Sequence, residues 1–134
     1  MAQAELDRQP TLTGEALVLR PLEECDREAL FSVASDRKIW EQHPAHDRWQ
    51  RPVFDAFFDD AMAKGGALAV IDRQSGKVVG SSRFQGYSRE EGGSVEIGWT
   101  FLSRDYWGGA ANREMKTLML RHALASVAEC RFAV

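Results

Sequence analysis

The sequence predicts an α+β domain built on a mixed, mostly antiparallel sheet that is flanked by helices. Three strand-like segments, 67–73, 77–87 and 94–102, follow one another with only turn residues between them. Strands with such short links pair antiparallel. A helical pattern then separates 94–102 from a last apolar segment, 130–134. This strand–helix–strand order predicts a right-handed crossover and one parallel pair of strands.

Composition narrows the class of protein. The chain has 134 residues, of which 44% are hydrophobic and 28% charged, as is typical of one globular domain. We therefore expect a single domain over 1–134, with 1–14 loosely held. A net charge of −3 without a basic block argues against a nucleic-acid partner. No apolar run has the length of a membrane span, and the start MAQAELDRQP lacks a signal-peptide core, so we expect a cytoplasmic protein without a membrane partner.

The first half of the chain predicts one strand and two helices. ALVLRPL, 16–22, has the composition of a strand, and apolar residues at helical spacing predict an amphipathic helix over 23–36. Residues 39–52 contain two Trp, two His and two Pro, which indicates an irregular loop. Pro52 suits the first turn of a second helix, and Gly65 and Gly66 end it.

The second half contains the predicted sheet and a third helix. Gly76 in QSGK supplies the positive φ that the turn between 67–73 and 77–87 needs. Alternation along 94–102 puts Ser94, Glu96, Gly98 and Thr100 on one side, and Val95, Ile97 and Trp99 on the other. A helix with a broad apolar face then runs to about Ala128, ahead of the strand 130–134.

The join between the 94–102 strand and the third helix, RDYWGGAANREM, allows two interpretations. The first backbone N–H groups of a helix have no partners within it, and Gly-Gly lets a ligand approach the backbone closely, so the turn could hold a phosphate. Alternatively, it is a glycine turn before a helix that Asn112 caps. The phosphate motifs GxxxxGK[ST] and GxGxxG are both absent.

The stretch EIGWTFLSRDYWGGAANREM resembles the signature of the GNAT acetyltransferase superfamily, and most closely its ribosomal-protein N-terminal acetyltransferase-like branch. In that branch an (A)EIGY strand precedes a YWGKGYATEA-type loop and helix. Glu96-Ile97-Gly98, Tyr106-Trp107-Gly108 and Glu114 match this pattern. The resemblance covers 12–134 and implies the GNAT fold.

The resemblance implies acetyl-coenzyme A as cosubstrate, without a metal. In the family the loop amides hold the pyrophosphate, and the end of the preceding strand pairs with the pantetheine arm. The implied cofactor-binding residues are Thr100, Phe101, Leu102, Trp107, Gly108, Gly109, Ala110, Ala111, Asn112 and Arg113. The sequence departs from the pattern at Ala110, where Gly is usual, and at Asn112, where Gly or Ala is usual.

A second departure concerns the end of the chain. Family members continue past the strand 130–134 with a helix and two more strands, which carry an Asn-x-x-Ser stretch and, in many members, the tyrosine that protonates the thiolate. The resemblance therefore implies a C-terminally truncated GNAT domain whose general acid lies in the absent segment, or a domain whose missing strands are supplied by a partner surface.

Other side chains are candidates for the reaction itself. The resemblance makes Glu96 the general base, and the alternative is an acid on the polar face of a strand. Family specificity lies between the first two helices, which makes Trp40, His43 and Arg48 acceptor-side candidates; Arg83 joins them from the hairpin strand, and loop packing is the alternative. No further ligands accompany His43 and His46, so no metal site is predicted.

Two functions follow from this. The first is N-acetyl transfer from acetyl-coenzyme A to a primary amine, on a small molecule or a protein N-terminus, by direct attack in a ternary complex. The second is a non-catalytic domain that binds coenzyme A or forms a homodimer through an exposed sheet edge.

Overall fold

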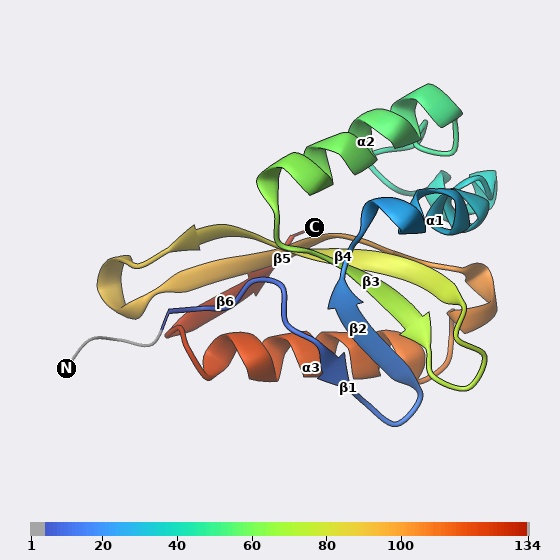
Figure 1. The fold of residues 1–134 in the computed structure, drawn as a ribbon. Coiled ribbons are helices and arrows are strands. Elements are labelled where there is room, and N and C mark those ends of the chain that lie inside the picture. The colour runs from blue at the N-terminus through green and yellow to red at the C-terminus, as the bar shows by residue number, and fades with distance from the viewer. Residues whose placement is uncertain (1–4, 134) are drawn as a thin grey trace.

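The computed structural model describes residues 5–133 and contains one curled, six-stranded sheet in the order β1-β2-β3-β4-β5-β6 (Figure 1). Its strands are β1 Leu12–Thr13, β2 Leu17–Pro21, β3 Ala67–Asp72, β4 Val78–Ser88, β5 Ser94–Leu102 and β6 Glu129–Phe132. Neighbouring strands pair antiparallel except β5 and β6, which are parallel. The predicted α+β class with a mixed, mostly antiparallel sheet is confirmed.

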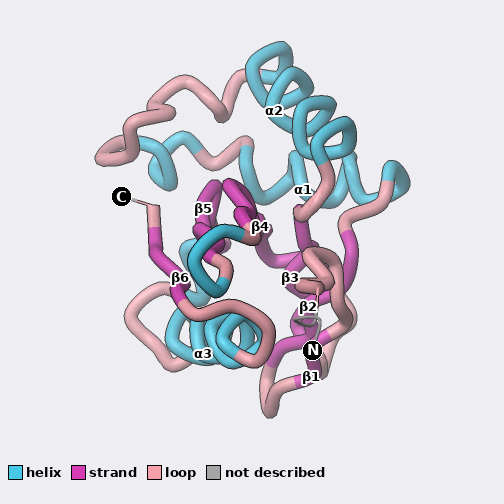
Figure 2. The backbone as a smooth tube through the Cα atoms, turned by 90° about the vertical axis from the view of Figure 1, so that its left-hand side faces the viewer, coloured by secondary structure: helices cyan, strands magenta, loops and turns pink. Residues whose placement is uncertain are grey.

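Helices cover both faces of the sheet, with α3 on one face and α1 and α2 on the other (Figures 1 and 2). Their bounds are α1 Arg27–Ala34, α2 Arg51–Lys64 and α3 Ala111–Leu124. The predicted 23–36 helix is shorter than expected because Glu24–Asp26 form a 3-10 turn. The last helix also ends earlier than Ala128, because the chain turns there to bury Val127 in the core.

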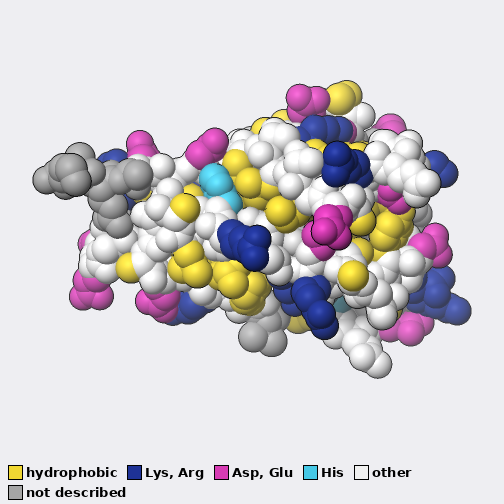
Figure 3. Space-filling view, turned by 90° about the horizontal axis from the view of Figure 1, so that it is seen from below, with side chains coloured by type: hydrophobic (Ala, Val, Ile, Leu, Met, Phe, Trp, Pro, Cys, Tyr) yellow, Lys and Arg dark blue, Asp and Glu magenta, His cyan; other side chains and the backbone are white. Residues whose placement is uncertain are grey.

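The sheet is therefore the middle layer between two hydrophobic clusters. On the α3 side, Phe84, Ile97 and Met119 belong to one buried cluster. On the α1 and α2 side, Trp40 and Phe54 belong to the other. The molecular surface on the α3 side, seen in Figure 3, carries scattered charged and apolar side chains rather than one continuous apolar patch. No helix in the described part of the chain is long and apolar enough to cross a bilayer.

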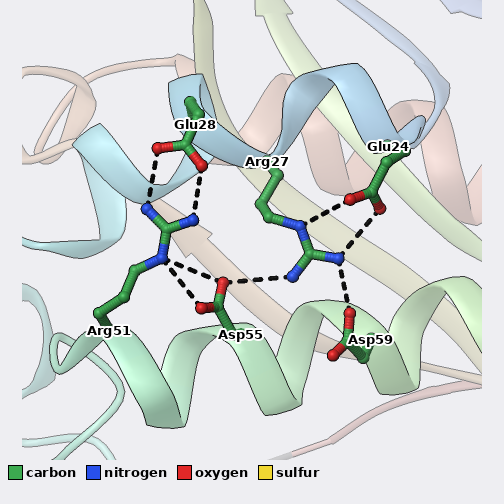
Figure 4. A network of polar contacts seen from close by, with 6 residues as sticks. All are labelled: Glu24, Arg27, Glu28, Arg51, Asp55 and Asp59. Atoms are coloured by element: carbon green, nitrogen blue, oxygen red, sulfur yellow. Dashed lines mark hydrogen bonds and ion pairs between the residues drawn. The ribbon is translucent and has the colours of Figure 1, made fainter.

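A network of ion pairs joins α1 to α2 above the second cluster (Figure 4). Arg27 bridges Glu24 to Asp55 and Asp59, and Arg51 bridges Glu28 to Asp55. Hydrogen bonds to these carboxylates raise the pKa of both guanidinium groups. The network fixes α2 relative to α1, and α2 carries residues of the candidate site.

The prediction that 1–14 is loose is wrong over the residues described, and residues 1–4 lie outside them. β1 pairs with β2, and Leu6 is buried against the sheet, with its N–H donating to the hydroxyl of Tyr87 at 3.2 Å. The polar composition of this segment concealed its apolar contacts, because Leu6 and Pro10 are buried and Leu12 packs against the α3-side cluster. After Leu6, the side chain of Arg8 donates to the Lys64 carbonyl, and the side chain of Gln9 donates to the Ala67 carbonyl.

The strict alternation predicted for 94–102 is also wrong. Between the pairs Arg83–Gly98 and Ser81–Phe101, β5 has one residue more than β4. The extra residue is Trp99, whose φ of 56° is rare for a bulky side chain. This bulge reverses the alternation: Val95, Ile97 and Leu102 pack in the α3-side cluster, whereas Trp99 and Phe101 pack on the face of α1 and α2.

Candidate functional site

One edge of β5 has a strand beside it over only half its length. β6 pairs with Ser94–Ile97, and its last contact is the Ala133 N–H donating to the Ile97 carbonyl at 2.8 Å. Beyond that point the sheet opens, and a cavity of about 280 Å³ begins. Its lining includes predicted cofactor residues, namely Thr100, Phe101, Leu102, Trp107, Gly108 and Asn112. The structure therefore brings the end of β5 and the loop before α3 into one groove.

The turn after β5 is fixed from outside the groove. The Tyr106 hydroxyl donates to the carboxylate of Asp72, and this hydrogen bond raises the pKa of Tyr106 to about 12. Arg104 pairs with Asp36, and the indole N–H of Trp107 donates to the Leu102 carbonyl at 3.0 Å. The turn is thus attached to β3 and to the segment after α1.

The two glycines of the turn, Gly108 and Gly109, differ in backbone conformation. Gly108 has φ +72°, in the left-handed region where other residues are strained. Gly109 is outside that region, and a Cβ at either position would meet nothing within 4 Å. Side-chain packing therefore explains neither glycine, and backbone conformation explains only Gly108. Gly109 leaves open space where a bulky ligand can approach the backbone.

The start of α3 settles how the helix is capped. Ala110 is the N-cap, no side chain accepts a capping hydrogen bond, and Asn112 lies inside the first turn. The alternative in which Asn112 caps the helix is therefore wrong. The Glu114 N–H donates to the Ala110 carbonyl at 2.9 Å, so the N–H groups of Ala111, Asn112 and Arg113 precede the first intrahelical bond.

The charges around these N–H groups suit an anion. Arg113 is exposed at the start of the helix. The acid of the first turn, Glu114, faces away, because its carboxylate accepts the N–H groups of Ala16 and Leu17, the latter at 2.7 Å. Free amides, a helix N-terminus, an exposed cation and an unoccupied strand edge together fit a long ligand that ends in phosphates, as acetyl-coenzyme A does.

Glu96 lies on the face of the sheet covered by α1 and α2, beside the bulge. Gln85, opposite it on β4, donates from Nε2 to Glu96 Oε1 at 2.5 Å, and the Trp99 indole N–H donates to Gln85 Oε1. Glu96 lines a cavity of about 450 Å³ that also contains Gln85 and Trp99. The predicted base is therefore half-buried, oriented by a neighbour, and open to a ligand.

Two buried arginines lie beside the same tryptophan. Arg83 is 3% exposed and Arg48 is 8% exposed, and their guanidinium carbons lie 4.3 Å and 4.8 Å from the centre of the Trp99 ring. Arg83 pairs with Asp60 through Nη1 at 2.9 Å. Burial, and then the charge of Arg83, lower the pKa of Arg48 to about 10. Arg83 lines the cavity beside Glu96 and Arg48 lines a further cavity, and their place on the acceptor side stays a prediction.

His43 and Trp40 have different positions. His43 lines both the groove at Thr100 and a further cavity of about 320 Å³ that contains Arg48. Its Nδ1 accepts the Ala45 N–H at 2.9 Å, and burial lowers its pKa, so the neutral ring carries its proton on Nε2. Trp40 is completely buried and donates to the Ala34 carbonyl at 2.7 Å. The guanidinium carbon of Arg48 lies 5.2 Å from the centre of the Trp40 ring, so Trp40 packs against another acceptor-side candidate, and its own role there stays a prediction.

Sequence reasoning missed Gln85 and the turned-over Trp99. Gln85 pairs with Glu96 across β4 and β5, so a known strand register would have identified it. The register shifts in this pair of strands cannot be read from the sequence. Asp60, the partner of Arg83, lies on α2 and has no local sequence signal. No group of three or more His, Cys, Asp or Glu side chains suited to a metal occurs among residues 5–133.

Comparison with known proteins identifies the fold family. Residues 16–132 match the family described as acetyltransferase (GNAT) domain. A GNAT-family acetyltransferase from Bacillus anthracis superposes with a TM-score of 0.72 at 22% identity, over 87% of this chain and 67% of that one. A GCN5-related N-acetyltransferase from Brucella melitensis superposes with a TM-score of 0.71 at 26% identity, over 93% of this chain and 58% of that one.

A GNAT-family protein from Chromobacterium violaceum gives a TM-score of 0.78 at 22% identity, over 94% of this chain and 65% of that one. This chain thus spans 58% to 67% of the length of these structures. No curated protein matches the sequence significantly.

Proposed function

This chain belongs to the GNAT acetyltransferase family, and on that premise we propose that it transfers an acetyl group from acetyl-coenzyme A to a primary amine. The observation that carries the proposal is the continuous groove from the free edge of β5 to the uncapped start of α3. Within the family, the EIG strand and YWG turn favour the ribosomal-protein N-terminal acetyltransferase-like branch.

Binding roles follow from the groove. The N–H groups of Ala111, Asn112 and Arg113 would hold the pyrophosphate, with Gly108, Gly109 and Ala110 leaving room for it. The backbone of Thr100, Phe101 and Leu102 would pair with the pantetheine arm as a further strand would, because Phe101 and Leu102 bury their side chains. Trp107 supports that backbone through the Leu102 carbonyl.

The chemistry requires positioning and one proton acceptor. Acetyl-coenzyme A supplies the thioester carbonyl that the amine attacks. The amine nitrogen forms the new bond to this carbon, the carbon–sulfur bond breaks, and the thiolate leaves with the electron pair. Glu96, oriented by Gln85, takes the proton that the attacking nitrogen loses.

A measurement of thiol release tests this. Glu96→Gln should lower kcat by roughly 10²-fold or more, as for the loss of a general base, while the thermal shift given by acetyl-coenzyme A stays unchanged. Glu90→Gln is the matched control, because Glu90 is exposed outside the groove. Full activity in the Glu96→Gln variant would exclude Glu96 as the base. No thermal shift at millimolar acetyl-coenzyme A would exclude the cofactor.

Two features favour a second, non-catalytic function: the lack of a tyrosine or cysteine as general acid among the described residues of the cavities at Thr100, and the exposed edge of the sheet. Among residues 5–133, neither tyrosine nor cysteine lines the two cavities that contain Thr100. β6 is the last strand of the described sheet, and Phe132 on it is 41% exposed. A domain that binds coenzyme A without turnover, or that pairs with a second copy through β6, would fit both features. A thermal shift without thiol release would favour it.

A further inference from the structure

The cavity beside Glu96 contains an excess of positive charge. Its lining includes the cations Arg8, Lys64, Arg83 and Arg131 against the single carboxylate of Glu96. Arg131 also pairs with Glu129, and Lys64 with Asp60, so two of these cations have partners at the surface. Arg83, on the cavity wall, shares Asp60 with Lys64, and it lies near Arg48, beside the same Trp99 ring.

The hydrogen-bonding atoms of Arg83 are only partly used. Nη1 donates to Asp60, but Nε and Nη2 are buried and have no partner among the described residues. These two nitrogens share one edge of the guanidinium plane, the edge that binds a carboxylate or phosphate with two parallel hydrogen bonds. Trp99 stacks over a face of the guanidinium and leaves this in-plane edge unengaged.

Arg48 adds a second buried cation. Its Nη1 also lacks a partner in the described chain, and Arg48 contacts the same Trp99 ring. Buried charged donors are normally paired, because removing them from water without a partner is costly. Contacts with the rings of Phe57 and Trp99 account for the position of both guanidinium groups, but they leave these three N–H-bearing nitrogens without an acceptor among the described residues.

We infer that the acceptor is an amine that also carries an oxyanion group, carboxylate or phosphate, which the Nε–Nη2 edge of Arg83 holds in the cavity beside Glu96. Arg48 supplies a second positive charge beside Trp99, and Arg8 and Lys64, which line the same cavity as Arg83, attract the anion. The amine of the same molecule then lies toward Glu96, which has the opposite charge. This inference rests on the proposed function only in that the amine is acetylated; binding of the oxyanion group does not depend on it.

Matched pairs of acceptors test the inference by turnover. 2-Aminoethyl phosphate is compared with 2-aminoethanol, and β-alanine with its amide, at equal concentrations of free amine. The anionic member should have a kcat/KM higher by about tenfold or more, the size of one charge-assisted hydrogen bond. The phosphate pair and the carboxylate pair show which oxyanion is preferred. Equal or faster acetylation of both neutral partners would overturn the inference and leave the proposed function standing.

Binding of the same compounds tests the anion site without turnover. 2-Aminoethyl phosphate or β-alanine should raise the melting temperature, and their neutral partners should not. This shift is expected even if no acetyl is transferred, so the two proposals can fail separately. Absence of any shift with both anionic amines would overturn the inference.

Variants test whether Arg83 is the group that causes the preference for anionic acceptors. Arg83→Met should reduce the anion preference to within about twofold, since the paired donors are lost. Asp60→Asn should increase the preference, because it removes the one carboxylate bound to Arg83, and a purely structural pair would not respond in this direction. Arg121→Gln makes the same charge change as Arg83→Met at an exposed position of α3 and should leave the preference unchanged. An unchanged preference in Asp60→Asn and in a folded Arg83→Met would overturn the inference.

Discussion

Replacing Gly109 with alanine separates the two reasons for which a turn contains glycine. A Cβ at Gly109 meets nothing within 4 Å, and its φ is not in the left-handed region. The variant should therefore be as stable as the parent or more stable by about 0.4–1 kcal/mol, because alanine restricts the unfolded chain. If the turn holds a pyrophosphate, the methyl group occupies the approach to the backbone. Loss of one charge-assisted hydrogen bond, about 1.5–3 kcal/mol, weakens binding by roughly tenfold or more.

Urea unfolding and calorimetric titration with acetyl-coenzyme A measure the two effects. Gly76→Ala is the matched control, because Gly76 also faces open space but has φ +76° in the β3–β4 turn. That variant should lose about 1 kcal/mol of stability and keep its affinity for acetyl-coenzyme A. Unchanged affinity in Gly109→Ala would refute the phosphate role of the turn. A large loss of stability in the same variant would show that the fold itself needs the glycine.

Three further changes test the supports of the groove and fold. Glu114→Gln should cost about 1–2 kcal/mol in a urea titration, since charge-assisted bonds to the N–H groups of Ala16 and Leu17 weaken; stability equal to the parent would contradict this. Burial lowers the pKa of His43, so the unfolded chain binds the proton more tightly, and stability should fall as the pH drops below 6.5. His43→Gln should reduce that slope by at most about 1.4 kcal/mol per pH unit, and an identical slope would contradict the assignment. Burial acts to raise the pKa of Asp26, but hydrogen bonds, chiefly from Arg20, outweigh it and lower the pKa. This stabilisation is present near neutral pH and is lost as acid protonates Asp26. Asp26→Asn should therefore cost about 1–3 kcal/mol at pH 7 and flatten the acid limb, and a variant as stable as the parent would refute the pairing.

The fold could be predicted from sequence because its signals are local and repeated. The short links between strands and the helical spacing in 51–64 and 111–124 are independent of distant contacts. The prediction of a loose N-terminus was wrong because a few apolar side chains, Leu6, Pro10 and Leu12, hold a polar segment against the core. Three apolar residues at these spacings form neither a helical nor a strand period that a pattern can detect.

The site was only partly predictable, for a different reason. The groove depends on consecutive residues, so the motif located it. The proposed acceptor side depends on a bulge at Trp99, which turns this side chain to the other face of the sheet. It also depends on a contact between Arg83 and Asp60 from different elements. Neither a bulge position nor a pairing across helix and sheet has a signature in one sequence.

Backbone amide NMR during titration with acetyl-coenzyme A shows directly where the cofactor binds. We expect the largest shifts at the N–H groups of Ala111, Asn112 and Arg113, with a second set along Thr100–Leu102, because these groups form the proposed groove. Titration with inorganic phosphate should reproduce the first set alone. Shifts confined to other parts of the sheet, or none at saturating ligand, would contradict the claim that this strand edge and helix start bind the cofactor.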